Sequence, residues 1–357
     1  MKYIFIVQGE GRGHMTQALS LADMLRRHGH TISRVIIGKS DRRVIPKFFL
    51  EKIGTPVLPL SSPNFVTDKQ QKSVRPWKTI AQSLVKTPAY RKSLKKIDEV
   101  VENDDPDFII NFYEFLGGLY YFLKKPRAEM ICIGHQYLLN HSSFEFPPNR
   151  SLDKMSMMIG NKITSLGASK LLALSFQEFG NEDDQNLKVV PPILRKEVTM
   201  SITSNEEHFL VYLLNPGYAD EIHQFHADHP DQKLHVFWDQ RNADDPMIID
   251  KNLVFHQLND ESFLAYMASC KGYVTTAGFE SVCEAMYLGK PVMMVPVAGH
   301  FEQACNAIDG IRAGAGISSD TFDISKLSDY LTNHKHDASS FRTWSDRAGE
   351  YIIRQMT

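Results

Sequence analysis

The residues best suited to chemistry lie between Tyr273 and Gly316, where polar side chains follow two short apolar runs. Gly278 comes after the first run, and the absence of a side chain there lets a ligand approach the backbone closely. Ser281 and Glu284 are three residues apart, so they share one face of a helix. Free backbone N–H groups at the start of such a helix suit an anion such as a diphosphate. The Glu284 carboxylate can accept hydrogen bonds from two adjacent hydroxyls, as a ribose offers.

A second polar group follows the apolar run Val292–Val297. Its members have side chains that hydrogen-bond to hydroxyls, and they are His300, Glu302, Gln303 and Asn306. In chain order, the segment therefore offers contacts for a phosphate, a ribose and a sugar. This order predicts a binding site for a nucleotide-sugar donor.

The pattern resembles the donor signature of inverting GT-B glycosyltransferases, above all the UDP-glucuronosyl/glucosyltransferases and the bacterial peptidoglycan N-acetylglucosaminyltransferases (families 1 and 28). The matched positions are Gly278, Ser281, Glu284-Ala285, Gly289-Lys290-Pro291, Gln303 and Asn306-Ala307. The chain departs from many family 1 members at Thr276, where they have histidine. The resemblance implies that Gly278, Ser281 and Thr276 contact the donor diphosphate. It further implies that Glu284 binds the ribose, and that Glu302 and Gln303 bind the sugar.

Near the N-terminus, the apolar run Tyr3–Gln8 is followed by the glycine-rich loop Gly9-Glu10-Gly11-Arg12-Gly13-His14. Such a loop can lie close to a ligand, and His14 would begin the amphipathic helix that follows. Imidazole is suited to removing a proton from a hydroxyl near neutral pH. The positive end of the helix favours its neutral form.

This loop resembles the Gly-x-x-Gly-Gly-His and Gly-His-x-x-Pro loops that open the acceptor domain in the same families. The resemblance implies that Gly11 and Gly13 belong to the acceptor loop and that His14 is the catalytic base, steadied by a carboxylate. The possible carboxylate partners are Glu10, Glu114 and Asp309. The alternative is that His14 only caps the helix or orients acceptor or donor phosphate. A dinucleotide fingerprint is excluded, because His14 stands where its third glycine is needed.

Three further positions are candidates for donor contacts. Arg195 resembles the linker arginine of the peptidoglycan transferases, and its planar head would neutralise the departing UDP. A solvated linker arginine is the alternative. Gly217 is the single glycine at the place of a phosphate loop in the second half. Leu258 is favoured over His256 as the neighbour of the nucleobase.

Composition excludes several classes of protein. The 357 residues, 43% hydrophobic and 23% charged, are typical of a globular protein with room for two domains. A formal charge of −2 gives no general attraction to nucleic acid. The four scattered cysteines predict neither a disulfide framework nor a zinc site. No apolar run reaches the roughly 18 residues of a membrane span, and the N-terminal stretch does not fit a signal peptide, so we expect a cytoplasmic enzyme.

Short apolar runs alternate with amphipathic segments in both halves of the chain, which is typical of α/β domains with parallel sheets. With the resemblance, this pattern predicts a GT-B fold with its active site in the cleft between two Rossmann-like domains. We expect an acceptor-binding domain over residues 1–195 and a nucleotide-sugar-binding domain over 196–336. Apolar residues at helical spacing over Asp337–Met356 predict a terminal helix that packs back on the first domain.

Basic residues recur on the helix predicted over Pro76–Asn103. They are Lys86, Arg91, Lys92, Lys95 and Lys96. A solvated helix face is the simplest interpretation. The alternative is peripheral contact with an anionic membrane, near which each basic residue adds about 1 kcal/mol.

A donor site of this type requires no metal ion and no other cofactor. The acidic pairs Asp104-Asp105 and Asp244-Asp245 resemble the Mn²⁺ ligands of GT-A enzymes, but each precedes a proline and is interpreted as a turn. The histidines at every third position, His223, His226 and His229, are interpreted as part of a solvated helix.

The sequence therefore predicts an inverting, metal-independent glycosyltransferase. Its donor would be a nucleotide sugar, most simply a UDP-sugar, and its acceptor a hydroxyl on a lipid, a glycan or a small molecule. Two alternatives stay open at this point. One is a nucleotide-sugar 2-epimerase of GT-B fold, and the other is a catalytically degenerate protein that only binds a nucleotide sugar.

Overall fold

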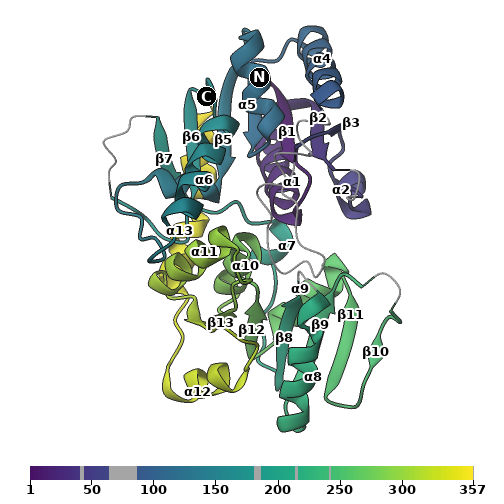
Figure 1. Cartoon of the computed structure of the whole chain (residues 1–357), viewed down its shortest axis with the longest axis vertical. Coiled ribbons are helices and arrows are strands. Elements are labelled where there is room, and N and C mark those ends of the chain that lie inside the picture. The colour runs from purple at the N-terminus through teal and green to yellow at the C-terminus, as the bar shows by residue number, and fades with distance from the viewer. Residues whose placement is uncertain (41–43, 64–86, 181–185, 214–215, 241–242, 357) are drawn as a thin grey trace.

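The computed structural model describes the whole chain except residues 41–43, 64–86, 181–185, 214–215, 241–242 and 357. Two α/β domains are stacked along the long axis of the molecule, with helices α10 (Phe279–Tyr287) and α11 (Phe301–Arg312) at their junction (Figure 1). Each domain is built on its own sheet with helices packed against it, as the alternating sequence pattern predicts.

In the described part of the first domain, a seven-stranded parallel sheet has the order β3-β2-β1-β4-β5-β6-β7. Its strands are β1 Lys2–Gln8, β2 Thr31–Lys39, β3 Val57–Ser61, β4 Phe108–Phe112, β5 Glu129–Gly134, β6 Lys170–Leu174 and β7 Leu187–Val190. Its helices are α1 Arg12–Arg27, α2 Lys47–Lys52, α4 Thr87–Asp104, α5 Phe115–Lys124, η1 His135–Asn140 and α6 Ser151–Thr164. The central strand β1 is buried from Tyr3 to Val7, which explains its unbroken apolar run.

The second sheet has the order β10-β11-β9-β8-β12-β13-β14 within the described residues. Its strands are β8 His208–Leu213, β9 Lys233–Trp238, β10 Met247–Ile248, β11 Leu253–Gln257, β12 Gly272–Thr275, β13 Val292–Met294 and β14 Gly316–Ser318. Besides α10 and α11, its helices are η2 Pro216–Tyr218, α8 Ala219–Asp228, α9 Asp260–Ser269 and α12 Ser325–Asn333. Edge strand β10 pairs antiparallel with β11, because the short connection between them allows only a hairpin.

The two sheets are joined by a segment that contains one short helix, α7 (Lys196–Thr199). The first sheet ends at Val190 and the second begins at His208, so the change of domain lies between them. The domain limits given above, at residues 195 and 336, stay predictions.

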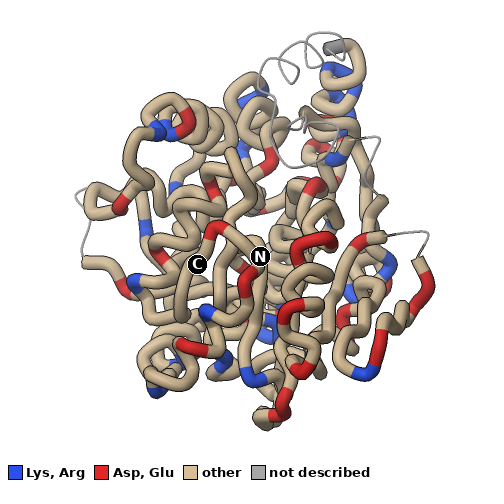
Figure 2. The backbone as a smooth tube through the Cα atoms, turned by 60° about the horizontal axis from the view of Figure 1, so that its bottom comes forward, with Lys and Arg blue, Asp and Glu red and all other residues tan. Residues whose placement is uncertain are grey.

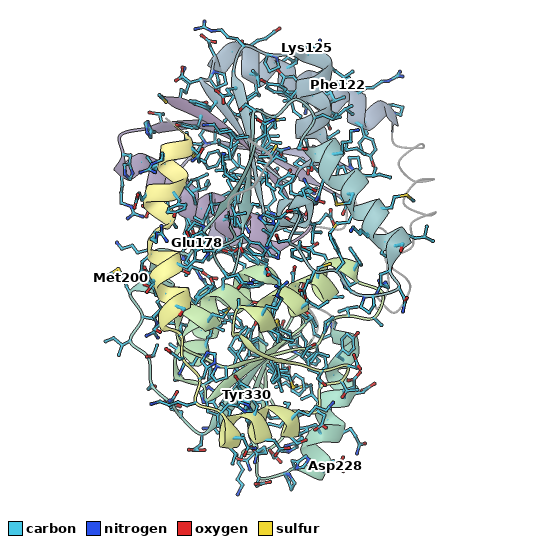
Figure 3. All side chains as sticks on the ribbon, turned by 90° about the vertical axis from the view of Figure 1, so that its left-hand side faces the viewer. Phe122, Lys125, Glu178, Met200, Asp228 and Tyr330 are labelled. Atoms are coloured by element: carbon cyan, nitrogen blue, oxygen red, sulfur yellow. The ribbon has the colours of Figure 1, made fainter. Side chains whose placement is uncertain are left out.

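The C-terminal segment returns to the first domain, as predicted, but it forms two helices instead of one. These are α13 (Ser339–Asp346) and α14 (Ala348–Gln355), and the break falls at Arg347. The Trp344 indole N–H donates to the carbonyl of Ser175 at 3.0 Å, and the Tyr3 hydroxyl donates to the carbonyl of Met356 at 2.8 Å. Both helices, yellow in Figure 3, run alongside the two domains past Glu178.

A continuous hydrophobic core connects the domains. One buried cluster begins in β1, includes Phe176 of the first domain, and continues through Phe279 into α10. The rings of Phe176 and Phe279 are 4.6 Å apart. Acidic and basic residues are interspersed over the backbone, in keeping with the small net charge (Figure 2). The contact between the domains is therefore partly apolar, and it fixes the elements that surround the candidate site.

Candidate active site

His14 lies in the first turn of α1, directly after the glycine loop that follows β1. It is 7% exposed, and its ring stacks on Tyr113 with 5.9 Å between the centroids. Burial lowers the pKa of His14 to about 4, although a hydrogen bond with Gln17 opposes the shift. The imidazole is therefore neutral at pH 7, which is the form that a general base requires.

Both ring nitrogens of His14 face glutamine side chains. Nδ1 lies 3.3 Å from Oε1 of Gln17, one helical turn further along α1. Nε2 lies 3.4 Å from Nε2 of Gln136, which belongs to η1. The same Gln136 nitrogen donates to Oε1 of Glu302 at 2.9 Å. One side chain thus separates His14 of the first domain from Glu302 of the second.

The three carboxylates that the sequence offered as partners of His14 bind other groups. Glu10 accepts from a backbone N–H at 2.7 Å, and Glu114 accepts from a serine hydroxyl and a backbone N–H. Asp309 accepts from a glutamine amide at 3.3 Å. The contacts of the two His14 ring nitrogens described above are with the glutamines Gln17 and Gln136.

Helix α10 begins after Gly278, and its first N–H groups receive no side-chain cap. The left-handed residue at this turn is Ala277, with φ of 59°, whereas Gly278 has φ of −72°, which any residue can adopt. A Cβ atom at Gly278 would have the Ser281 hydroxyl, 3.8 Å away, as its nearest contact. Gly278 therefore leaves the start of the helix uncovered, where an anion could reach the N–H groups. Thr276, immediately before this turn, is buried.

The residues predicted for the ribose and for the diphosphate bind each other. Arg195 donates to both carboxylate oxygens of Glu284, at 2.6 and 3.0 Å, and also to Asp260 of α9. Burial raises the pKa of Glu284, and the nearby guanidinium opposes this shift. Burial disfavours the charge on Arg195, but Glu284 and Asp260 together raise its pKa above the usual range. In this conformation Arg195 and Glu284 bind each other. A ligand that binds to either side chain must therefore break or rearrange this ion pair.

The sugar-binding residues predicted in α11 have distinct surroundings. Burial raises the pKa of Glu302 to about 7, against the hydrogen bond from Gln136. Gln303 is buried, and its Oε1 accepts from the backbone N–H of Val297 at 2.8 Å. Its oxygen therefore holds the loop before α11, and its amide nitrogen is the group that a sugar hydroxyl could use.

The remaining predicted positions are spread around the junction. Gly11 is the N-cap of α1, and a Cβ atom at Gly13 would lie 3.7 Å from Cβ of Glu280. Gly13 therefore marks a close approach of the two domains. Gly217 lies exposed in η2, and Leu258 is half-buried against the core.

Four residues at the junction were not among the predicted site residues. Glu280, in the first turn of α10, accepts from Nε2 of Gln17 at 2.9 Å, and Gln136 lies beside His14. His135 stacks on Phe279 with 3.9 Å between centroids, and its Nε2 is 4.0 Å from a carboxylate oxygen of α11. Spacing alone would have indicated Gln17, which is one helical turn from His14, and Glu280, which is one turn before Glu284.

Several buried polar atoms at the junction have no hydrogen-bond partner among the described residues. They are Oε1 of Glu280, Oε1 of Gln136, Nε2 of His135, Oδ1 of Asn306 and Oδ2 of Asp309. Leaving a buried polar atom unpaired costs about 1–3 kcal/mol. Nε2 of His135 and Oδ2 of Asp309 face each other at 4.0 Å, whereas Oε1 of Glu280 and Oε1 of Gln136 are atoms to which a polar ligand could supply the missing partner.

The basic helix face predicted from the sequence lies on α4. Arg91, Lys92 and Lys95 are exposed, Lys96 is half-buried, and Lys95 pairs with Glu99 at 3.6 Å. Lys86 lies outside the described residues. No helix in the described part of the chain is both long and apolar enough to cross a membrane.

The described residues contain no group of three or more histidine, cysteine or acidic side chains that could hold a metal ion. Two of the residues considered as ligands in the sequence have other contacts. His226 pairs with Asp250 at 2.8 Å, and Asp245 accepts from the backbone N–H of Gln257 at 3.0 Å.

Solved structures of similar fold cover the whole molecule. A glycosyltransferase of kitacinnamycin has a TM-score of 0.66 and 17% identity, and the match covers 99% of this chain and 98% of that one. The spinosyn forosaminyltransferase SpnP has a TM-score of 0.63 and 13% identity, with coverage of 100% and 98%. The spinosyn rhamnosyltransferase SpnG, complexed with thymidine diphosphate, has a TM-score of 0.61 and 12% identity, and both chains are covered completely. At these identities the similarity shows the GT-B fold alone.

Sequence comparison supplies the family. A search of curated proteins finds no match. The family model described as "Glycosyl transferase family 1" matches residues 1–334, which is nearly the whole chain. The protein therefore belongs to glycosyl transferase family 1.

Proposed function

We propose that the protein transfers a sugar from a nucleotide-sugar donor to an acceptor hydroxyl, with inversion at the anomeric carbon and without a metal ion. The supporting observation is the set of buried polar atoms without a hydrogen-bond partner among the described residues at the contact between the two domains, including those of Gln136 beside His14 and of Glu280 behind Gln17. These atoms come from elements of both domains, so a ligand that satisfies them must bind between the domains. A donor held by the second domain and an acceptor held by the first meet this requirement.

The donor would bind at α10 and α11. The uncapped start of α10 and the Ser281 hydroxyl suit the diphosphate, and Glu284 suits the ribose hydroxyls. For this, Arg195 must leave Glu284 and move to the diphosphate, where its planar head can bind two oxygens. Glu302 and the Gln303 amide would then hold the sugar. We propose UDP as the nucleotide. Since SpnG was solved with thymidine diphosphate, dTDP-sugars are the first alternative donors to test.

The reaction would be a single in-line displacement. Nε2 of His14 takes the proton of the acceptor hydroxyl while the acceptor oxygen forms a bond with the anomeric carbon. The bond from that carbon to the diphosphate breaks on the opposite face, and the leaving group takes the electron pair. One displacement inverts the configuration. The start of α10 and Arg195 stabilise the negative charge that develops on the diphosphate.

The second candidate, a nucleotide-sugar 2-epimerase, is favoured by one observation. Such an enzyme needs carboxyl groups near the sugar that can both donate and accept protons. Burial raises the pKa of Glu280 to about 8 and that of Glu302 to about 7. Near neutral pH both carboxyl groups can therefore either donate or accept a proton. The epimerase would convert the nucleotide sugar without any acceptor.

A product assay separates the two functions. The protein is incubated with UDP-glucose, UDP-N-acetylglucosamine and dTDP-glucose, with and without a panel of hydroxyl acceptors and EDTA, and the products are identified by mass spectrometry and NMR. The proposal expects an acceptor-dependent glycoside of inverted configuration, formed equally well in EDTA. An isomerised nucleotide sugar in reactions without acceptor would instead establish the epimerase. A glycoside with retained configuration, or activity that disappears in EDTA, would contradict the mechanism.

A further inference from the structure

A chain of five polar side chains crosses the contact between the domains twice. It begins at Glu280 in α10, passes through Gln17 and His14 in α1 and Gln136 in η1, and ends at Glu302 in α11. The four successive distances are 2.9, 3.3, 3.4 and 2.9 Å. The two ends belong to the second domain and the three middle residues to the first. Which ring nitrogen of His14 has the proton follows from which of the neighbouring atoms can donate a hydrogen bond and which can only accept one.

On one side, Gln17 connects His14 to Glu280. Oε2 of Glu280 accepts from Nε2 of Gln17, which turns the amide oxygen of Gln17 toward Nδ1 of His14. This oxygen can only accept, so Nδ1 must have the proton. A neutral imidazole has one N–H and one lone pair, and the lone pair is therefore on Nε2.

The contact between His14 and Gln136 requires the same tautomer of the imidazole. Nε2 of Gln136 has two hydrogens, of which one goes to Oε1 of Glu302. The other points to Nε2 of His14 at 3.4 Å, and only a lone pair there can receive it. Two independent neighbours thus select one tautomer, in which Nε2 is the basic nitrogen and faces Glu302.

Glu280 is well placed to fix this arrangement. It is buried, and Gly13 allows α1 to approach it, with a separation of 3.7 Å between the two Cβ positions. Its second oxygen, Oε1, has no partner among the described residues. As a carboxylate, Glu280 can only accept. In the acid form, a proton on the unpartnered Oε1 likewise leaves Oε2 to accept from Gln17.

We propose that Glu280 of the donor domain is the positioning residue for His14, acting through the Gln17 amide. The protonation pattern of the base is then set by Glu280 across the domain contact, and not by Glu10, Glu114 or Asp309, the partners considered from the sequence. The contact through Gln17 is made only while α10 is docked against α1, whereas Gln136 favours the same tautomer from within the first domain. This inference depends on the proposed function, since it assigns a role in the same reaction.

The test measures the tautomer of the His14 imidazole by NMR. Protein with ¹⁵N-labelled histidine gives separate NMR signals for the two ring nitrogens, and the His14→Gln variant identifies which signals belong to His14. The wild-type protein is expected to show a protonated Nδ1 and an unprotonated Nε2. In Glu280→Gln the new amide can present either a donor or an acceptor, so only the longer contact from Gln136 still selects the tautomer; the preference is expected to weaken and the Nδ1 signal to move. Gln17→Met removes the connection without touching the carboxyl group, and it should have the same effect.

Glu114→Gln is the matched control, because Glu114 is also a buried carboxyl group and one of the partners considered from the sequence. It is expected to leave the His14 signals unchanged. Circular dichroism and the melting temperature establish that each variant is folded. If Glu280→Gln does not fold, Gln17→Met decides the question alone. Wild-type protein with the proton on Nε2, or folded Gln17→Met with unchanged His14 signals, would overturn the proposal.

The kinetic readout separates positioning from donor binding. In Glu280→Gln and Gln17→Met, kcat is expected to fall by at least about tenfold, and by no more than the 10²–10⁴-fold that a general base contributes in total. KM for the donor should change little in Gln17→Met. The NMR result needs no turnover, so the two proposals fail separately. The expected tautomer without sugar transfer would contradict only the proposed function, and transfer with an unaffected tautomer would contradict only the role of Glu280.

Discussion

At the scale of single residues, the site is defined by groups whose burial changes their chemistry. His14 is neutral because it is buried, and the carboxyl groups of Glu280 and Glu302 hold protons near neutral pH for the same reason. Arg195 and Glu284 are the exception, because they are buried as an ion pair. Each case leads to a different consequence of substitution.

Replacing His14 by alanine should remove the base without removing the donor site. We expect kcat to fall by about 10²–10⁴-fold, while the dissociation constant of the nucleotide stays within a few-fold of wild type. Steady-state kinetics and calorimetric titration measure the two quantities. His28→Ala, an exposed position at the end of the same helix, is the control and should retain full activity. Full activity in His14→Ala would mean that another group is the base.

Removing one partner of the buried Arg195–Glu284 pair should be costly. The side chains are 11% and 4% exposed, so Arg195→Ala leaves a buried carboxylate without its cation. We expect the free energy of unfolding to decrease by about 3–5 kcal/mol in urea titrations. The double variant Arg195→Met with Glu284→Met should recover much of this loss. A loss below about 1 kcal/mol in Arg195→Ala would show that the pair is not buried in solution.

At the scale of elements, the starts of three helices determine the site. α1, α10 and α11 each begin close to the polar chain from Glu280 to Glu302, and α1 and α10 follow the inner strands β1 and β12 of their sheets. This is the usual place for ligands in parallel α/β sheets. Helix α9 has a different role, because it covers a group of histidines on the second sheet.

These histidines should make the second domain sensitive to acid. His208, His235 and His256 lie beside Tyr266 of α9, and Nδ1 of His235 is 2.9 Å from Nε2 of His256. Burial, with the neighbouring histidines, lowers the pKa of His235 to about 3, and burial lowers the pKa values of the other two. In the unfolded chain their pKa is about 6.5. Stability should therefore be full above about pH 6.5 and decrease as the pH falls from there toward about 3.

Urea titrations between pH 8 and pH 4 measure this decrease. The variant His235→Phe removes the group with the largest shift and should make the profile flatter. An unchanged profile in a folded His235→Phe variant would show that protonation of this group does not limit stability.

The sequence predicts the elements better than it predicts their contacts. The strand expected over Tyr3–Gln8 is observed as Lys2–Gln8, because an unbroken apolar run is typical of a buried parallel strand. The glycine loop and the start of α10 are local features, and both occur as predicted. Strand β10 and helix α2 were not predicted, since segments of two and six residues give no clear periodicity.

The partners of the site residues could not be predicted in the same way. Gln17 and Glu280 are 263 positions apart, and only the docking of the two domains brings them together. The Arg195–Glu284 pair likewise depends on where the linker lies relative to α10. The sequence indicates which side chains could bind a nucleotide sugar, but the structure is needed to show which of them bind each other.

At the scale of the whole molecule, the C-terminal helices hold the domains together. α13 and α14 leave the second domain and pack on the first, where Trp344 and Met356 make hydrogen bonds with the first sheet and its loops. Under the proposed function, the Arg195–Glu284 pair is the contact that must open for a donor to bind. The terminal helices provide a connection that can persist while this contact opens.

Truncating Trp344 to alanine should weaken this connection. The residue is 5% exposed, so we expect the free energy of unfolding to decrease by about 3–5 kcal/mol. Arg354→Ala, at an exposed position of α14 where the side chain pairs with Glu350 at the surface, should change it by less than about 0.5 kcal/mol. Equal effects of the two substitutions in urea titrations would contradict the described packing of α13.

The central claim is that a nucleotide sugar binds between the domains without a metal ion. The melting temperature in the presence of UDP, dTDP, GDP, UDP-glucose or UDP-N-acetylglucosamine, each with and without EDTA, tests it most directly. We expect UDP and at least one UDP-sugar to raise the melting temperature more than GDP does, to the same extent in EDTA. A larger rise in melting temperature with dTDP would indicate dTDP instead of UDP as the nucleotide, and it would still support the donor site. No rise with any nucleotide at millimolar concentration, in a folded sample, would contradict the donor site and the roles given to Glu284 and Gln303.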